Sequence, residues 1–345
     1  MILYNVFFSF LILMFASNLA AQDIEARLSG ATNAQGFTVQ DNASNSLFTV
    51  RGDGKAGLGT GSPVFKLTLE KDGGILAKGT EGAGATLPSM TGPVMIWYPR
   101  KSAFRAGYAY LGNWNDAKIG KYSFAAGSVP TASGTASIAL GNYTIASGGT
   151  STALGFKTNA SGGVSTAFGY QTVATGTYSS ALGRETTAGG ESSTAMGHKT
   201  KSNGFASTAM GYETSATSDA SIATGYKTTA SGKYSTAMGF ISNASGHAST
   251  AIGYENNATG DYAIVMGYKS YASGKQSVSI GSYVSTNGIT GSMILGDAST
   301  TTLRKAFKEN KFYAFFDGGY HLFTNGTGTS YVYLNHNDNA WKTSS

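Results

Sequence analysis

The sequence of 345 residues has no cysteine, only 5 prolines and only 12% charged residues. Without cysteine there is no disulfide scaffold, no thiolate metal site and no thiol nucleophile. No proline lies between Thr131 and Ser299, so nothing in that stretch interrupts a β-ladder. The net charge of +6 is small and dispersed, which argues against a nucleic-acid partner.

The first 22 residues carry no charged side chain, and Val6 to Ala16 form an apolar run interrupted only by Ser9. This run is too short to span a bilayer but has the length of the hydrophobic region of a secretory signal. We therefore predict that residues 1–21 are a signal peptide, cleaved near Ala21, and that the mature chain is exported by a bacterial route. The alternative is a buried core segment.

Glycine, by contrast, is abundant, with 48 copies, and many of them repeat every fourteen residues. The repeated glycines are Gly127, Gly141, Gly155, Gly169, Gly183, Gly197, Gly211, Gly225, Gly239, Gly253, Gly267 and Gly281. Most have serine four positions before, alanine two before and a second glycine seven after. This period is too short for two helices, and frequent glycine opposes helix formation. It predicts an all-β solenoid in which two short strands and two turns make each coil.

Each position of the repeat then becomes a column along the rod. Leucine, methionine, isoleucine or phenylalanine usually precedes the glycine, as in Leu140, Met210 and Ile280, and we predict that this column is the buried ladder. Alternation along the strand places two more columns on the same face: threonine three positions before the glycine and an aromatic residue directly after it. The aromatic column is the candidate binding column, formed by Phe156, Tyr170, Tyr212, Tyr226, Phe240, Tyr254 and Tyr268. Because a fourteen-residue coil encloses little volume, we expect several chains to pack side by side.

The core Ser-x-Ala-(Leu/Met/Ile)-Gly, repeated from about Ser123 to Gly296, resembles the YadA-like head repeats of trimeric autotransporter adhesins. The resemblance implies a left-handed parallel β-roll and a homotrimeric head on the bacterial cell surface, associated with the outer membrane. It also implies binding of a ligand on host or neighbouring cells, with a glycan or a matrix protein as the expected classes. We expect only indirect contact with the membrane itself.

The flanks of the repeats predict small β-rich caps. We predict a cap or stalk base over 22–120, head repeats over 121–298 and a hairpin segment over 299–345, with strands at 312–316 and 320–324. Met95 to Gly107 is expected to close one open end of the rod. The C-terminal segment resembles the stretch that precedes an endosialidase-type intramolecular chaperone. In that family the chaperone assembles the trimer and is then released by autocatalytic cleavage.

Two overlapping motifs in the N-terminal flank suggest binding functions that turn formation also explains. Gly52 to Gly57 have the glycine spacing of a dinucleotide loop, but the glycines that follow and Pro63 oppose the helix that this motif requires. Arg51-Gly52-Asp53 is an integrin-type triplet if a loop tip displays it, although Gly-Asp-Gly is also ordinary turn chemistry. We therefore expect no cofactor.

No arrangement of nucleophile and base is visible, so we predict no catalytic residue and no enzyme. His336 has Asp338 close by, but such a pair is more typical of a solvated surface than of a metal site, and we expect no metal. Two alternatives to an adhesin stay open: a tailspike-like depolymerase and an ice-binding protein. The latter would display the threonines three positions after the glycine, which are Thr144, Thr158, Thr172, Thr186, Thr200, Thr214 and Thr228.

Overall fold

The computed structural model describes residues 36–58, 60, 62–63, 65, 67–69, 75–323 and 331–343. The chain divides into two compact units between Ala77 and Lys78. The predicted signal peptide lies outside the described residues. Within the described residues, the helical structure consists of two short 3-10 turns, η1 (Pro99–Lys101) and η2 (Asp116–Lys118), so the fold is all-β as predicted. The same residues contain no helix long and apolar enough to cross a membrane.

The N-terminal unit contains a four-stranded sheet in the order β1-β2-β3-β4. Its strands are β1 (Gly36–Gln40), β2 (Ser46–Arg51), β3 (Ala56–Leu58) and β4 (Leu67–Leu69). Strands β2 and β3 pair antiparallel, and the turn between them is closed by the Arg51 N–H, which donates to the Lys55 carbonyl at 2.8 Å. The segment from Gly52 to Gly57 is thus a hairpin turn that leads into a strand.

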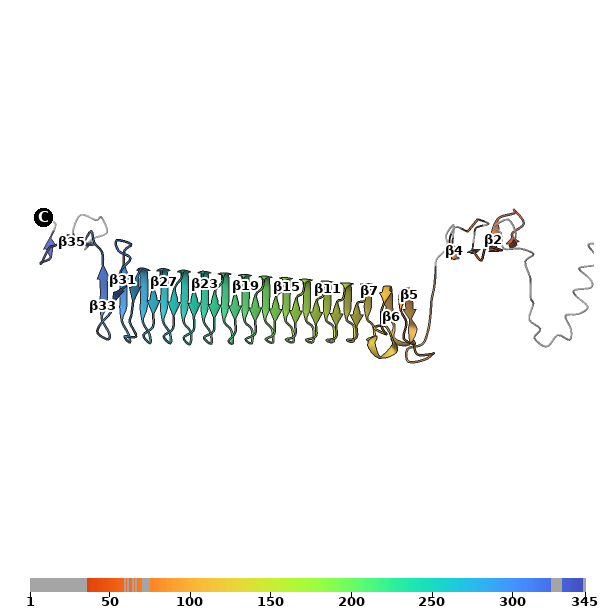
Figure 1. The fold of residues 1–345 in the computed structure, drawn as a ribbon, viewed down its shortest axis with the longest axis horizontal. Coiled ribbons are helices and arrows are strands. Elements are labelled where there is room, and N and C mark those ends of the chain that lie inside the picture. The colour runs from red at the N-terminus through yellow and green to blue at the C-terminus, as the bar shows by residue number, and fades with distance from the viewer. Residues whose placement is uncertain are drawn as a thin grey trace, which may run out of the picture. The chain divides into compact units, whose positions relative to one another are not determined.

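The second unit is dominated by a parallel β-solenoid, as predicted, whose coils stack one after another along a rod (Figure 1). Most coils contain one long strand of five residues and one short strand of two. The long strands lie in a 16-stranded sheet and the short strands in a 13-stranded sheet. Neighbouring coils pair fourteen residues apart, so that Thr152 lies beside Thr166 and Gly155 beside Gly169.

The bounds of the strands follow the repeat closely. The long strands are β7 (Phe124–Ser128), β9 (Ile138–Asn142), β11 (Thr152–Phe156), β13 (Thr166–Tyr170), β15 (Ser180–Arg184), β17 (Thr194–His198), β19 (Thr208–Tyr212), β21 (Ile222–Tyr226), β23 (Thr236–Phe240), β25 (Thr250–Tyr254), β27 (Ile264–Tyr268), β29 (Val278–Ser282), β31 (Met293–Gly296) and β33 (Phe312–Phe315). The short strands are β8 (Thr131–Ala132), β10 (Ile145–Ala146), β12 (Asn159–Ala160), β14 (Val173–Ala174), β16 (Thr187–Ala188), β18 (Lys201–Ser202), β20 (Ser215–Ala216), β22 (Thr229–Ala230), β24 (Asn243–Ala244), β26 (Asn257–Ala258), β28 (Tyr271–Ala272), β30 (Val284–Ser285) and β32 (Arg304–Lys305).

Small side chains fill the interior of the solenoid. In the coil around Gly211, the side chains of Ser207, Ala209, Thr214 and Ala216 are at most 1% exposed. The backbone at Gly211 has a φ of +125°, and a Cβ atom added there would lie 2.1 Å from the carbonyl oxygen of Gly225 in the next coil. Glycine is therefore required at this position both by the backbone conformation and by the close approach of the coils.

A hairpin closes the N-terminal end of the solenoid. Strands β5 (Gly92–Tyr98) and β6 (Ala103–Ala109) pair antiparallel, and β6 pairs parallel with β7, so the hairpin extends the long-strand sheet. Arg105 projects into the interior, where its guanidinium donates to the Ser123 carbonyl at 3.0 Å and the Ala132 carbonyl at 2.9 Å. Burial lowers the pKa of Arg105 to about 10, a value still high enough that the guanidinium stays charged at neutral pH. The expectation that Met95 to Gly107 closes this end agrees with this geometry.

The C-terminal end is closed in a related way, but the predicted hairpin is wrong. Strand β33 pairs parallel with β31 and thereby continues the solenoid sheet. Strand β34 (Tyr320–Phe323) pairs antiparallel with β35 (Tyr331–Leu334), which pairs with β36 (Lys342–Thr343). The reason is that β33 pairs in register with the edge of β31, so it does not form a hairpin with β34 across the turn at Asp317. Arg304 enters the last coil and donates to the Ser282 carbonyl at 3.1 Å.

Candidate functional site

The outer face of the long strands, which we call the outer face, is apolar and exposed on a single chain. Met210 is 40% exposed and Phe168 48%, whereas Ala209, next to Met210 in the sequence, is fully buried. Within the single chain, the column before the glycine is therefore not in the interior, contrary to the prediction of a buried ladder. The physical reason is that the narrow coil has room for alanine and serine but not for leucine or methionine. The column shares a face with the threonine and aromatic columns, as predicted.

The threonines three positions after the glycine lie in the interior of the solenoid. Each of the seven, from Thr144 to Thr228, is at most 1% exposed. The hypothesis that they form an ice-binding face is wrong, because ice cannot contact a buried side chain. The residue before each threonine has a positive φ, for example 52° at Glu213, and this turn reverses the alternation that would have pointed the threonine outward.

Two rims border the outer face, and they differ in their aromatic residues. The first rim is the turn from each long strand to the next short strand, and it carries the predicted aromatic column. Along it, the rings from Tyr212 through Tyr226, Phe240 and Tyr254 to Tyr268 stack in series, with centroids 4.8–5.1 Å apart and interplanar angles of at most 18°. Because each ring face is covered by its neighbours, only ring edges and hydroxyl groups of this column are available to a ligand.

Charged side chains accompany the aromatic column on the first rim and pair between coils. Lys227 Nζ lies 3.5 Å from Glu213 Oε2, and Lys269 Nζ lies 3.7 Å from Glu255 Oε2. The negative charge of Glu213 raises the pKa of Tyr212, so this phenol stays protonated at neutral pH. On the first rim, the aromatic rings thus stack on one another and the charged side chains pair with one another.

The second rim, the turn from each short strand to the next long strand, carries aromatic residues that the sequence reasoning missed. They are Tyr178, Phe205, Tyr234 and Tyr262. The repeat pattern did not reveal them, because they occupy two adjacent positions of the repeat and do not form a single column. The signal that finds them is their recurrence in every second coil, a spacing of about twice the fourteen-residue period.

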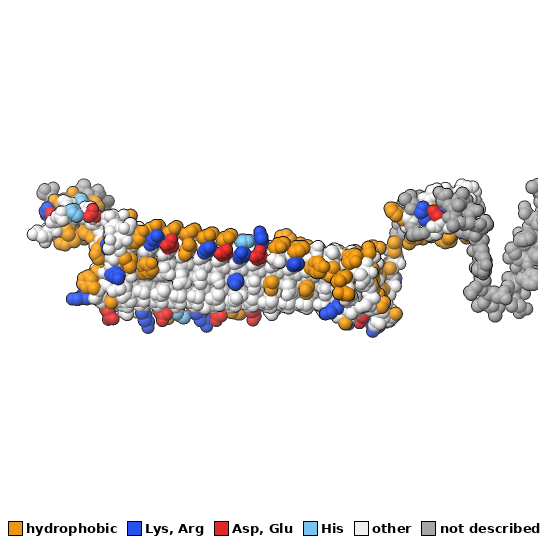
Figure 2. Space-filling view, viewed as in Figure 1, with side chains coloured by type: hydrophobic (Ala, Val, Ile, Leu, Met, Phe, Trp, Pro, Cys, Tyr) orange, Lys and Arg blue, Asp and Glu red, His pale blue; other side chains and the backbone are white. Residues whose placement is uncertain are grey.

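The outer face of the short strands, which we call the polar face, has few charges. Figure 2 shows it as a largely uncharged strip with charged side chains along both long edges and hydrophobic side chains along one of them. Exposed serine and threonine line it, among them Ser161, Thr217 and Ser245, and Lys201 is a charged residue within it. This face has the character of a solvated surface.

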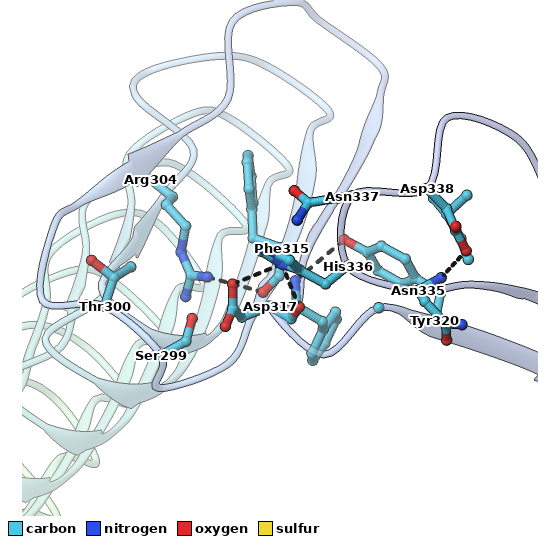
Figure 3. Close-up of a pocket in the computed structure, with 13 residues that line it drawn as sticks. Ser299, Thr300, Arg304, Phe315, Asp317, Tyr320, Asn335, His336, Asn337 and Asp338 are labelled. Carbon is cyan, nitrogen blue, oxygen red and sulfur yellow. Dashed lines mark hydrogen bonds and ion pairs between the residues drawn. The ribbon is translucent and has the colours of Figure 1, made fainter.

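A hollow lies between the last coil of the solenoid and the C-terminal strands (Figure 3). His336 Nδ1 lies 3.2 Å from Asp317 Oδ1, while the predicted neighbour Asp338 binds Lys342 Nζ at 2.7 Å. His336 thus contacts Asp317 and not Asp338, and it is exposed, in agreement with the prediction of a solvated surface. The hydroxyl of Ser299, which also lines the hollow, does not bond to this histidine.

That hydroxyl donates instead to Asp297 Oδ1 at 2.6 Å, and Arg304 donates to the same oxygen at 2.8 Å. The hydrogen bonds from Ser299 and Arg304 hold the pKa of Asp297 well below its usual range. A carboxylate held in this way is a poor proton acceptor, and its hydrogen bonds tie Ser299 and Arg304 together at the end of the solenoid.

The other predicted site residues lie in ordinary structural settings. The Arg51-Gly52-Asp53 triplet lies at the β2–β3 turn, and the Asp53 carboxylate lies 3.0 Å from Lys55 Nζ. Within the described part of the chain, no group of three or more His, Asp or Glu side chains is placed to hold a metal ion.

The repeats match a known family. The family model YadA head domain repeat (2 copies) matches residues 132–158, 146–172, 160–186, 174–200, 202–228, 230–256 and 258–283. No curated protein matches the chain. The resemblance of the C-terminal segment to the region before an endosialidase-type chaperone stays a prediction, since the family match ends at residue 283. The YadA head repeat model thus matches successive repeats across residues 132–283, somewhat less than half of the chain.

Proposed function

We propose that the protein is a non-enzymatic adhesive fibre, exported to the outside of a bacterial cell, in which three identical chains pack through their outer faces. The observation that carries the proposal is the apolar outer face itself. It runs along the 16-stranded sheet and includes side chains as exposed as Met95 (75%), Phe168 (48%) and Phe312 (62%).

A single chain leaves its large apolar side chains in water, because alanine, serine, threonine and glycine occupy its interior. Exposed apolar surface costs about 25 cal/mol per Å². Monomeric proteins rarely expose a continuous apolar patch of this extent, so we expect another protein surface to cover this face. A second and third copy of the same chain supply one, since identical coils repeat at identical spacing and keep apolar rows opposite one another.

One coil supports the functional importance of this face by an exchange of residues. Seven coils place threonine or serine three positions before the glycine and a large apolar residue one before, as in Thr208 and Met210, while the coils of β9, β27 and β29 have apolar residues at both positions. The coil of β21 has Ile222 and Thr224 instead, so the two residue types have changed places. The volume and apolar character of the face are thereby retained. The YadA head repeat match adds support, because such heads are typically homotrimeric and located on the cell surface.

The mass of the mature chain in sedimentation equilibrium tests the proposal. We expect three times the chain mass at micromolar concentration. Replacing Met210 and Met238 by Glu buries like charges in the packed face and is expected to give monomers. Ser231→Glu with Ser245→Glu, on the polar face, is the matched control and should remain trimeric. A folded monomer of the unaltered chain would overturn the proposal.

A further inference from the structure

The second rim presents aromatic rings at a regular distance. Tyr178, Phe205, Tyr234 and Tyr262 are 59%, 54%, 54% and 50% exposed, more than any ring of the predicted aromatic column. They belong to the coils of β15, β19, β23 and β27, which are separated by one coil each. With coils about 4.8 Å apart, successive rings lie roughly 9–10 Å from one another along the rod.

At this distance the aromatic rings do not cover one another, and Lys233 Nζ lies over the Tyr234 ring, 5.5 Å from its centroid. Rings two coils apart are too far from each other to stack, in contrast to the rings of the first rim. Between Tyr234 and Tyr262 lies His247, whose ring meets both tyrosines edge-on, at centroid distances of 5.5 and 5.2 Å. The histidine therefore holds the two phenol rings in position, as a spacer between two platforms.

Hydrogen-bonding groups alternate with these rings on the same rim. Asp219 lies in the coil between Phe205 and Tyr234, where its carboxylate accepts from the Phe205 N–H at 3.3 Å and lies 3.2 Å from Lys233 Nζ. In the same way, Asp261 accepts from the His247 N–H at 3.0 Å. Acidic and basic side chains are mixed along the rim, so it has no strong preference for a charged ligand.

We propose that the second rim binds an extended, uncharged polysaccharide that lies along the rod. Its sugar rings place their apolar C–H faces on the four aromatic platforms, and its hydroxyl groups bond to the polar side chains between them. The platform spacing is about the length of one disaccharide unit of an extended β-linked glycan, so every second sugar meets a ring. Four weak contacts in series give avidity without a deep pocket.

Two observations favour a glycan over a peptide. An extended β-strand repeats every two residues at about 6.6 Å, which does not fit the platform spacing. A polyproline helix repeats every three residues at about 9.3 Å, but it is recognised in grooves between aromatic side chains. The rings of the second rim project from a turn and are at least 50% exposed, so that a ligand lies on them and does not enter a groove between them. The inference rests on the proposed fibre, in which packing through the outer face leaves this rim accessible.

Retention of the assembled protein on microcrystalline cellulose and on chitin beads tests the inference. We expect both to retain it, and soluble coiled amylose not to compete. The variant combining Phe205→Thr, Tyr234→Ala and Tyr262→Ala should lose about tenfold or more in affinity. It is expected to fold, because Thr177, Ala220 and Ala248 occupy the equivalent positions of other coils. Tyr143→Ala, an equally exposed tyrosine on the first rim with a similar φ of 53°, is the matched control and should bind normally.

A second variant changes the spacing and keeps the number of rings. Tyr234→Ala with Ala248→Tyr moves one platform by a single coil, and we expect it to bind as weakly as Tyr234→Ala alone. Unchanged retention of the triple variant would overturn the inference. So would retention of a Gly-Pro-Pro repeat peptide instead of the two glycans. Loss of the trimer in the triple variant would also overturn it, by making the rim a chain contact. The mass of the unaltered protein separates these outcomes from failure of the proposed fibre.

Discussion

Each rim of the solenoid has a turn residue of positive φ and carries aromatic residues, seven in the first-rim column and four on the second rim, but the rings pack differently. On the first rim they recur in successive coils and cover one another, as Tyr226 does between Tyr212 and Phe240. On the second rim they recur in alternate coils and do not stack on one another. The difference teaches that in a β-solenoid the period of a residue type, and not its abundance, separates a stabilising ladder from a binding surface.

The largest expected effect comes from breaking the coil spacing on which both rims depend. Gly211→Ala places a Cβ atom 2.1 Å from the Gly225 carbonyl oxygen at a φ of +125°, and we expect it to lower the free energy of unfolding by more than about 4 kcal/mol. Gly149→Ala is the matched control, since nothing lies within 4 Å of its added Cβ. Denaturant unfolding measures both variants, and equal stabilities would contradict this account of the glycine column.

Removing one ring from each rim tests whether the rings differ in their structural role. Tyr226→Ala removes two stacked contacts and should lower the free energy of unfolding by about 1–2 kcal/mol. Tyr178→Ala on the second rim should change it by less than about 0.5 kcal/mol, because that side chain is 59% exposed. Thermal and denaturant unfolding of the two variants provide the comparison. A larger loss for Tyr178→Ala would reverse the roles assigned to the rims.

The backbone of the two rims is expected to respond alike. Ile241 on the first rim and Val164 on the second are β-branched residues with φ values of 51° and 55°, in the left-handed region. Asn tolerates this region better, so Ile241→Asn and Val164→Asn should each raise the free energy of unfolding by about 1 kcal/mol. Similar gains would place the difference between the rims in their side chains alone. A gain on one rim only would show that the backbones are not equivalent.

The smallest effect concerns alkaline pH on the first rim. Glu213 raises the pKa of Tyr212, and a hydrogen bond to Glu255 raises the pKa of Tyr254. A raised phenol pKa favours the folded state below the unfolded value of about 10, and that contribution is lost as the pH rises through the folded value. Glu213→Gln should therefore shift the ultraviolet titration of Tyr212 to lower pH. An unchanged titration would remove Glu213 as the cause.

The fold was predictable because the repeat itself encodes it. Glycine every fourteen residues, flanked by residues of strand propensity, predicts a coil of two strands and two turns, and the family match covers the same stretch. The alternation that places Thr208, Met210 and Tyr212 on one face was also evident from the sequence. What could not be read was which face is inside, because large apolar residues usually form the core and this coil is too narrow to admit them.

The candidate surface was harder to predict, for a geometric reason. The alternation of inward and outward residues does not continue through a turn whose residue has a positive φ, and Thr214 after Glu213 is consequently buried. The second-rim aromatics occupy two neighbouring positions, as with Phe205 and Tyr234, and they align only after the coils are stacked. At the C-terminal end, β33 joined the solenoid because an in-register edge was available.

The two buried arginines have a consequence for the size of the molecule. A stack of parallel strands has no intrinsic end, since its last coil is as good a template for another strand as any coil before it. Arg105 at one end stands in the interior column that carries alanine in other coils, and Arg304 at the other end stands in the column that usually carries threonine or serine. Each arginine therefore prevents a further coil from stacking on its end of the solenoid. Duplication of a fourteen-residue unit then lengthens the solenoid between the two arginines without leading to end-to-end polymerisation.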